Sequence, residues 1–251
     1  MHPELAKKRN MRDLSYLSLP DGKKLKPGLF YRGAAVRKMG SDLQWQFSSL
    51  GIKTIVDLRT AVELQRKPDL CFPGISYVHV PILSEQTMGI THEKSVVGFS
   101  APPDMPSLYA GMVTDPSSVE AIKRVLELIF DPNREGPILW HCTEGKDRCG
   151  IVSALFLLAL GYDKDDVVAD YTFNNPQSEK KGRLYSRLVK YVLFKPHMSQ
   201  AVYKVMLAVP EYLESALHAM EEQCGSVSAF LGQRLGLTAE KIADFKRRYM
   251  E

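Results

Sequence analysis

Short hydrophobic runs alternate with amphipathic stretches through the first two thirds of the chain. By composition, strands are predicted at 29–32, 53–58, 75–81 and 138–140. Between them, 42–50 reads as a helix that stops at Gly51. Strands separated by helices predict an α/β fold with a central, mostly parallel sheet of four or five strands flanked by helices.

Two further helices flank the last of these strands. Asp115 can cap a helix whose first residue is Pro116, and its apolar face carries Val119, Ile122, Leu126 and Ile129. The second helix, 149–160, is apolar almost all round, which predicts that it is enclosed on every side.

Helical patterns dominate after Gly161. The predicted helices are 163–173, 177–194, one that includes 213–220 and ends near Gly225, and a last one capped by Thr238. We therefore expect one domain, 1–251, with four parts: an N-terminal arm (1–27), a catalytic core (28–162), a helical lid (163–207) and C-terminal helices (208–251).

Two irregular segments complete this organisation. The N-terminal arm is polar and contains the turn signal Pro20-Asp21-Gly22, so we expect it to pack on the domain without joining the sheet. The segment 84–106 is long, rich in proline and without period, and such loops are usually functional. We interpret it as a flap beside the active site.

Composition narrows the class of protein. The chain has 251 residues, 45% hydrophobic content and a net charge of +4, which fits anionic substrates but not the dense basic face of a nucleic-acid binder. Its four cysteines lack the spacing of a disulfide framework or a zinc site. With no signal peptide or bilayer-length apolar run recognised, we expect a cytoplasmic monomer, and a secreted effector role stays open.

The stretch with the clearest chemistry is 141–150, His-Cys-Thr-Glu-Gly-Lys-Asp-Arg-Cys-Gly. It lies between an apolar strand and an apolar helix, so its backbone N–H groups can converge at the positive end of a helix dipole. That position favours a phosphate and also lowers a thiol pKa, which would make Cys142 nucleophilic. Arg148 could grip two phosphoryl oxygens.

This loop resembles that of the cysteine-dependent phosphatases, and is most similar to bacterial tyrosine and dual-specificity enzymes with a Gly-Lys-Asp-Arg loop. The likeness extends to segments on both sides of the loop, namely 10–13, 29–32, 54–59 with Glu63, 167–171 and 211–238. It implies a protein tyrosine phosphatase-like fold and hydrolysis of phosphoprotein or phosphoinositide esters through a phosphocysteine, without a metal or cofactor.

The resemblance also implies roles for single residues. Cys142 would attack phosphorus, Arg148 would hold phosphoryl oxygens, and Asp147 would be the general acid and base, with Asp104 on the flap as the alternative acid. The remaining loop residues expected to contact substrate are Thr143, Glu144, Gly145, Lys146, Cys149 and Gly150, with Lys146 adding charge at the rim. We expect His141, Asp57 and Arg59 to support the loop structurally.

Two loop residues depart from the family pattern. Glu144 stands where a small residue is usual, so it could tighten selectivity or lower the affinity for highly phosphorylated substrates. Cys149 replaces a serine or threonine whose hydroxyl steadies the thiolate, and a thiol is a weaker donor. Slower breakdown of the phosphoenzyme is our hypothesis, which unchanged turnover in a burst assay of Cys149→Thr would contradict. For Cys71, a buried small hydrophobe is favoured over a redox partner of Cys142.

Several alternatives stay open. The chain could be an inactive module that binds phosphorylated ligands, or, more remotely, a rhodanese-type sulfurtransferase. The basic residues at 180–190 are either a solvated helix face or part of a lid helix that attracts anionic lipid head groups or phosphopeptides. The expected partners are a phosphorylated protein or phosphoinositide and a transient membrane surface, and no nucleic acid.

Overall fold

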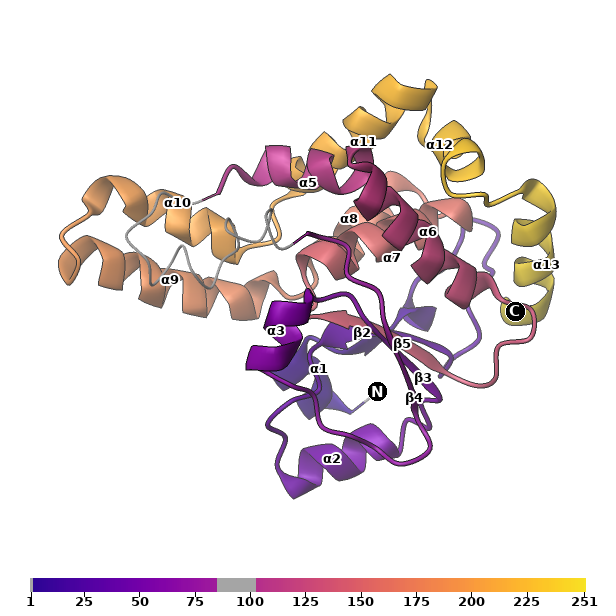
Figure 1. Ribbon diagram of the computed structural model, residues 1–251, viewed down its shortest axis with the longest axis horizontal. Coiled ribbons are helices and arrows are strands. Elements are labelled where there is room, and N and C mark those ends of the chain that lie inside the picture. The colour runs from indigo at the N-terminus through magenta and orange to yellow at the C-terminus, as the bar shows by residue number, and fades with distance from the viewer. Residues whose placement is uncertain (1, 85–102) are drawn as a thin grey trace.

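A five-stranded sheet forms the centre of the protein, as a computed structural model describing residues 2–84 and 103–251 shows (Figure 1). Its spatial order is β1-β2-β5-β3-β4. All neighbours are parallel except β1 and β2. The strands are β1 (Arg12–Asp13), β2 (Phe30–Ala34), β3 (Thr54–Asp57), β4 (Ser76–His79) and β5 (Ile138–Cys142). The predicted α/β fold with a mostly parallel sheet is confirmed.

The strand β5 lies in the middle of the sheet, between β2 and β3. All five of its residues are buried, as expected of a parallel strand covered on both faces. Side chains alternate between two cores: Ile138 and Trp140 belong to the larger one, and Leu139 belongs to the smaller one. Cys142 therefore stands at the carboxyl end of the central strand, where loops of parallel sheets commonly carry function.

Helices cover both faces of the sheet (Figure 1). The described helices are α1 (Pro3–Arg9), α2 (Ser41–Ser48), α3 (Ala61–Arg66), α5 (Met105–Thr114), α6 (Pro116–Phe130), α7 (Asp147–Ala159), α8 (Lys164–Thr172), α9 (Asn175–Tyr191), α10 (Pro196–Met206), α11 (Pro210–Cys224), α12 (Val227–Gln233) and α13 (Ala239–Tyr249). A short 3₁₀ turn, Leu14–Tyr16, follows β1. No helix among the described residues has the length and hydropathy needed to cross a bilayer.

Capping and stop residues in the sequence predicted the ends of several helices correctly. Asp115 caps α6 by accepting a hydrogen bond from the Ser118 amide at 2.9 Å, and α6 ends before Asp131. The helix α7 is buried along nearly its whole length. Gly225 ends α11 with a left-handed backbone, φ +80°. These predictions succeed because each depends on residues close in sequence.

The prediction that the N-terminal arm stays outside the sheet was wrong. Arg12 and Asp13 form β1, the edge strand that pairs with β2. The strand has only two residues and no hydrophobic alternation, so composition could not reveal it. Its position depends on a distant partner, because the buried Arg12 side chain forms an ion pair with Asp170 of α8 at 2.7 Å.

The helices α9 and α10 pack against one another and project from the body as an arm, which we call the α9–α10 arm, residues 175–206 (Figure 1). Gly182 of α9 leaves room for the Tyr203 ring of α10, since a Cβ at position 182 would lie 3.0 Å from that ring. The arm falls within the segment predicted as a lid. Most of the predicted flap, residues 85–102, lies outside the described residues, and the end of it forms the start of α5.

Candidate active site

The loop from Cys142 to Arg148 connects the end of β5 to the first turn of α7. Cys142 is only 3% exposed. Gly145 allows the loop to fold tightly, since its φ is +67° and a Cβ would lie 2.4 Å from the Gly33 carbonyl carbon. Any other residue would push the loop away from β2.

The carbonyl groups of this loop are held from below. Arg32 Nη2 donates to the Gly145 and Lys146 carbonyls at 3.0 and 3.2 Å, and Asn10 Nδ2 donates to Gly145 and Glu144 at 3.0 and 3.1 Å. The carbonyl and N–H of a peptide unit point in opposite directions. Carbonyls held on this side therefore leave the loop amides free to face an anion on the other side.

Asp170 anchors the guanidinium groups behind the loop. It forms buried ion pairs with Arg12 and Arg32, and Tyr16 donates to it at 3.0 Å. Burial alone would raise the pKa of Asp170, but the charges of Arg32 and Arg12 lower it to about 2. Sequence reasoning placed Asp170 only within a family segment and gave it no partner.

Cys142 lies in surroundings that favour its thiolate. The neighbouring Cys149 thiol contributes most to lowering the pKa of Cys142 to about 5; burial opposes this shift and the Arg148 charge adds to it. Burial and the neighbouring Cys142 raise the pKa of Cys149 well above its usual value, so Cys149 keeps its proton. The hydrogen bonds of the Cys149 thiol itself are to the Gly33 carbonyl at 3.6 Å and the Trp140 carbonyl at 3.9 Å.

Replacing Cys149 by alanine is expected to move the acid limb of the kcat/KM pH profile above its wild-type position near pH 5. The sign follows because the thiolate forms as pH rises through the Cys142 pKa, and alanine removes the neighbouring thiol that contributes most to lowering that pKa. A pH series with an aryl phosphate measures the shift. An unchanged limb would show that Cys149 does not stabilise the thiolate.

Arg148 is oriented by an acidic partner from α3. Its Nη1 and Nη2 donate to the two carboxylate oxygens of Glu63 at 2.6 and 2.8 Å. Glu63 is itself fixed by a capping box with Thr60 and accepts from the Thr143 hydroxyl. Burial would raise the pKa of Glu63, but Arg148 lowers it to about 2. The only local signal for this role is the Thr60-x-x-Glu63 capping pattern.

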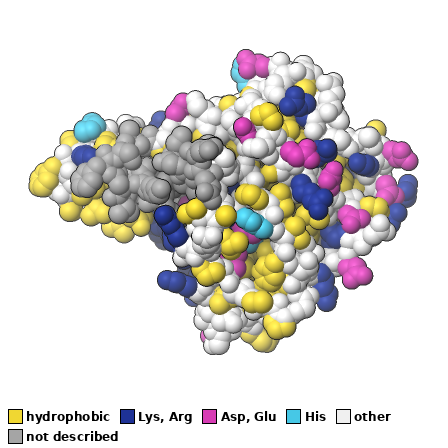
Figure 2. All heavy atoms as spheres, viewed as in Figure 1, with side chains coloured by type: hydrophobic (Ala, Val, Ile, Leu, Met, Phe, Trp, Pro, Cys, Tyr) yellow, Lys and Arg dark blue, Asp and Glu magenta, His cyan; other side chains and the backbone are white. Residues whose placement is uncertain are grey.

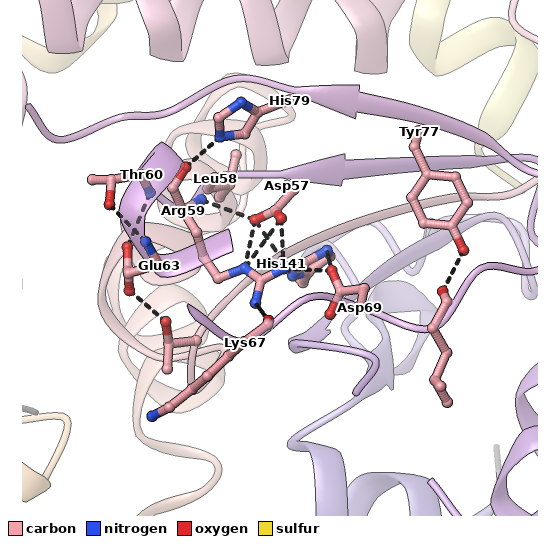
Figure 3. A network of polar contacts seen from close by, with 12 residues as sticks. Asp57, Leu58, Arg59, Thr60, Glu63, Lys67, Asp69, Tyr77, His79 and His141 are labelled. Atoms are coloured by element: carbon pink, nitrogen blue, oxygen red, sulfur yellow. Dashed lines mark hydrogen bonds and ion pairs between the residues drawn. The ribbon is translucent and has the colours of Figure 1, made fainter. Parts of the chain in front are cut away.

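A second polar network supports the strand ends beside the loop (Figure 3). Arg59 donates to Asp57 at 2.7 Å and to Asp69 at 2.6 Å, and His141 Nε2 lies 3.2 Å from Asp69. Burial would lower the pKa of His141, but Asp69 and Asp57 raise it. The predicted support residues Asp57, Arg59 and His141 are thus brought together, and Asp69 is a partner that sequence reasoning missed.

Asp57, Asp69 and His141 also form the one group among the described residues with donor atoms close enough for a metal ion. The Arg59 guanidinium already bonds to both carboxylates. A dication would have to share them with that fixed positive charge, so this donor set fits a metal poorly.

The two candidate acids are placed differently. The Asp147 side chain lies at the first turn of α7 and accepts a hydrogen bond from the Tyr109 hydroxyl at 2.5 Å. Tyr109 is paired at 2.7 Å with the Tyr171 hydroxyl. Asp104 is exposed at the start of α5, and its carboxylate accepts from Ser107. Of the two candidates, Asp147 is therefore the carboxylate that lies at the loop itself.

Lys146 does not stand at the rim as expected. It is 4% exposed, and its Nζ donates to the Val205 and Leu207 carbonyls at 2.6 and 3.2 Å, where α10 ends. The carbonyls at a helix carboxyl terminus lack partners within the helix and attract a cation. Lys146 therefore connects the loop to the base of the α9–α10 arm, a contact that no sequence pattern shows.

The remaining candidates have mixed surroundings. Glu144 is half-buried, and Gly150 lies in α7, where a Cβ would be 2.9 Å from the Tyr171 ring. Gly150 is thus required for packing.

Cys71 is exposed, so the expectation of a buried small hydrophobe was wrong. It lies in an irregular connection between α3 and β4, where periodicity predicts no burial.

A buried cysteine at the end of the central parallel strand, followed by a tight loop that ends at Arg148, is the arrangement found in cysteine-dependent phosphatases. The model of the tyrosine phosphatase family matches residues 3–251, and the chain belongs to this family of enzymes. This assignment excludes the sulfurtransferase alternative.

Two curated relatives cover most of the chain. A protein of Cupriavidus necator assigned as a tyrosine-protein phosphatase is 26% identical over 93% of this chain and 84% of its own. The triple specificity protein phosphatase PtpB of Mycobacterium tuberculosis is 28% identical over 82% of this chain and 86% of its own.

Among solved structures, the chain is similar to TpbA of P. aeruginosa, at 18% identity over 71% of this chain and 86% of that one, with a TM-score of 0.37. It is also similar to the catalytic core of the PP-IP phosphatase Siw14 of S. cerevisiae, at 16% identity over 64% and 79%, with a TM-score of 0.34. Such low scores add nothing to the assignment, which stands on the family match and the site.

Proposed function

We propose that the chain hydrolyses phosphate monoesters through a phosphocysteine at Cys142. The observation that carries the proposal is the meeting of a Cys142 thiolate, whose pKa is lowered to about 5, with the Arg148 guanidinium at the amino terminus of α7. A thiolate and a fixed cation beside converging amides suit attack on a phosphoryl group.

The reaction has two steps. In the first, Cys142 Sγ attacks phosphorus while Arg148 and the loop amides bind the phosphoryl oxygens, and protonated Asp147 gives its proton to the departing ester oxygen. In the second, Asp147 accepts a proton from a water molecule that attacks the phosphocysteine, which releases phosphate and restores the thiolate. Arg148 and the amides supply the positive charge, so no step uses a metal.

We propose phosphotyrosine in proteins as the main substrate. Cys142 is nearly inaccessible, and a nucleophile set this deep favours the long aryl ester of phosphotyrosine over shorter phosphoserine and phosphothreonine esters. The names of the two relatives are consistent with this choice. Phosphoinositides, whose phosphates lie on a wide ring, are the competing substrate class.

Rates on matched substrates test this assignment. We expect kcat/KM on a phosphotyrosine peptide to exceed that on the same peptide with phosphoserine, and on a short-chain soluble phosphoinositide, by at least about tenfold, a difference of 1.4 kcal/mol in transition-state binding. Faster turnover of the phosphoinositide would contradict the choice of substrate while leaving the role of Cys142 intact.

Replacing Asp147 by asparagine is expected to lower kcat about 100-fold on phenyl phosphate, because asparagine cannot protonate the leaving oxygen. On dinitrophenyl phosphate, whose leaving group needs no proton, the formation of the phosphocysteine should change little. Burst kinetics with both esters measure the difference. As a control, Asp104→Asn should leave both esters unaffected; a loss confined to Asp104→Asn would assign the acid to α5 instead.

A further inference from the structure

Exposed hydrophobic side chains are concentrated on the α9–α10 arm. Of the eleven large hydrophobic side chains exposed in the described part of the chain, seven lie between residues 184 and 194. They are Leu184, Tyr185, Leu188, Tyr191, Val192, Leu193 and Phe194. Figure 2 shows hydrophobic side chains along the lower edge and at the end of the projecting arm. A concentration of exposed apolar side chains on one element marks a site of interaction.

This surface is not the seam between the two helices. On the inner side, Gly182 faces Tyr203, and Ser186 is hydrogen-bonded to Ser199 at 2.7 Å. Leu184, Leu188 and Tyr191 follow at spacings of four and three residues, so they form one stripe on a different face of α9. Packing within the arm therefore leaves the stripe uncovered.

The tip of the arm holds an aromatic ring outward. Phe194 is 84% exposed and has a left-handed backbone, φ 51°, which is unusual for a bulky residue. The turn around it is closed by hydrogen bonds from the Leu193 amide to the Leu188 carbonyl and from the Lys195 amide to the Val189 carbonyl. The backbone of the turn thus maintains an exposed ring at the end of the projection.

The charge of the arm identifies its partner. Residues 175–206 contain seven lysines and arginines and one acid, Glu179, a formal charge of +6, whereas the whole chain carries +4. The rest of the molecule is therefore slightly acidic. The single acid is paired with Arg183. Amphipathic helices with a basic polar face and exposed aromatic and leucine side chains bind the interface of anionic bilayers.

We propose that the α9–α10 arm is a docking element for anionic membrane surfaces, with Tyr191, Phe194 and the neighbouring apolar side chains entering the interface and the lysines and arginines contacting acidic head groups. The inference is independent of which phosphate ester Cys142 hydrolyses. Because Lys146 binds the carbonyls that end α10, docking would take place on an element attached to the phosphate-binding loop.

Vesicle co-sedimentation with the full chain tests this surface. Wild type is expected to bind mixed phosphatidylcholine–phosphatidylserine vesicles at least about tenfold more tightly than phosphatidylcholine vesicles. The pair Tyr191→Ser with Phe194→Ser and the pair Lys180→Glu with Lys181→Glu should each weaken that binding at least about tenfold. Matched controls, Trp45→Ser on α2 and Lys7→Glu with Lys8→Glu on α1, should bind like wild type. Hydrolysis of a soluble aryl phosphate verifies that each variant is folded.

A second measurement reports directly whether the tip of the α9–α10 arm enters the membrane interface. In Phe194→Trp, the added indole fluorescence should shift to shorter wavelength with mixed vesicles and not with phosphatidylcholine. Equal binding of wild type and both arm variants would overturn the proposal. The proposal would also be overturned if the arm did not bind vesicles but bound an acidic phosphopeptide or associated with a second copy of the chain.

Discussion

Replacing Cys142 by serine is expected to lower kcat at least about 10⁴-fold, because a serine hydroxyl remains protonated where the thiol is ionised. The Cys149 thiol and the Arg148 charge lower the pKa of Cys142 to about 5, although burial opposes this. Arg148 and the loop amides stay in place, so inorganic phosphate or a phosphotyrosine peptide should still bind. Single-turnover kinetics and calorimetric titration measure these two properties separately.

The chain offers a matched control for this substitution. Cys71 is an exposed cysteine, and Cys71→Ser should keep wild-type turnover. Turnover of Cys142→Ser within about tenfold of wild type would contradict the assigned nucleophile. Wild type that binds a phosphotyrosine peptide but hydrolyses nothing would instead support the inactive binding module.

Replacing Asp170 by asparagine is expected to lower the free energy of unfolding by about 3–5 kcal/mol, since the change leaves the guanidinium groups of Arg12 and Arg32 buried without their counter-charge. Both arginines are at most 3% exposed. The loss should also slow catalysis, because Arg32 holds the Gly145 and Lys146 carbonyls in the loop between Cys142 and Arg148. Urea unfolding measures the first effect.

The same substitution has a defined pH dependence. The pKa of Asp170 is about 2 in the folded protein against 3.8 for an ordinary aspartate, so its ion pairs stabilise the fold above about pH 3.8 and lose that contribution as pH falls toward 2. The stability difference between wild type and Asp170→Asn should therefore shrink below about pH 4. Asp244→Asn, which removes exposed pairs with Arg247 and Arg248, should leave the stability close to that of wild type at any pH.

The parts of the site that sequence could predict are contiguous. Cys142 and Arg148 are six positions apart in one loop. Continuous apolar runs predict the strand before this loop and the helix after it. The cap at Asp115 and the stop at Gly225 are equally local. In each case the chemistry is carried by residues that stay neighbours whatever the rest of the chain does.

The parts that sequence could not predict are contacts between distant segments. Glu63 reaches Arg148 across 85 positions, and Asp170 reaches Arg12 across 158. The sequence does not indicate which arginine an acidic residue on a helix will pair with, because tertiary packing determines that. The burial of Lys146 shows the same limit, because the distant groups that accept its hydrogen bonds are backbone carbonyls, which residue type does not reveal.

Trapping the reaction intermediate tests the central claim most directly. Wild type mixed with an excess of an aryl phosphate and quenched in acid within the first turnover should carry one phosphoryl group on the peptide that contains Cys142, detected by mass spectrometry. With dinitrophenyl phosphate, whose leaving group needs no proton, Asp147→Asn should accumulate more of this intermediate than wild type, because only the activation of water is slowed. Phosphorylation of another residue, or product release in a burst with Cys142 unmodified, would contradict the account.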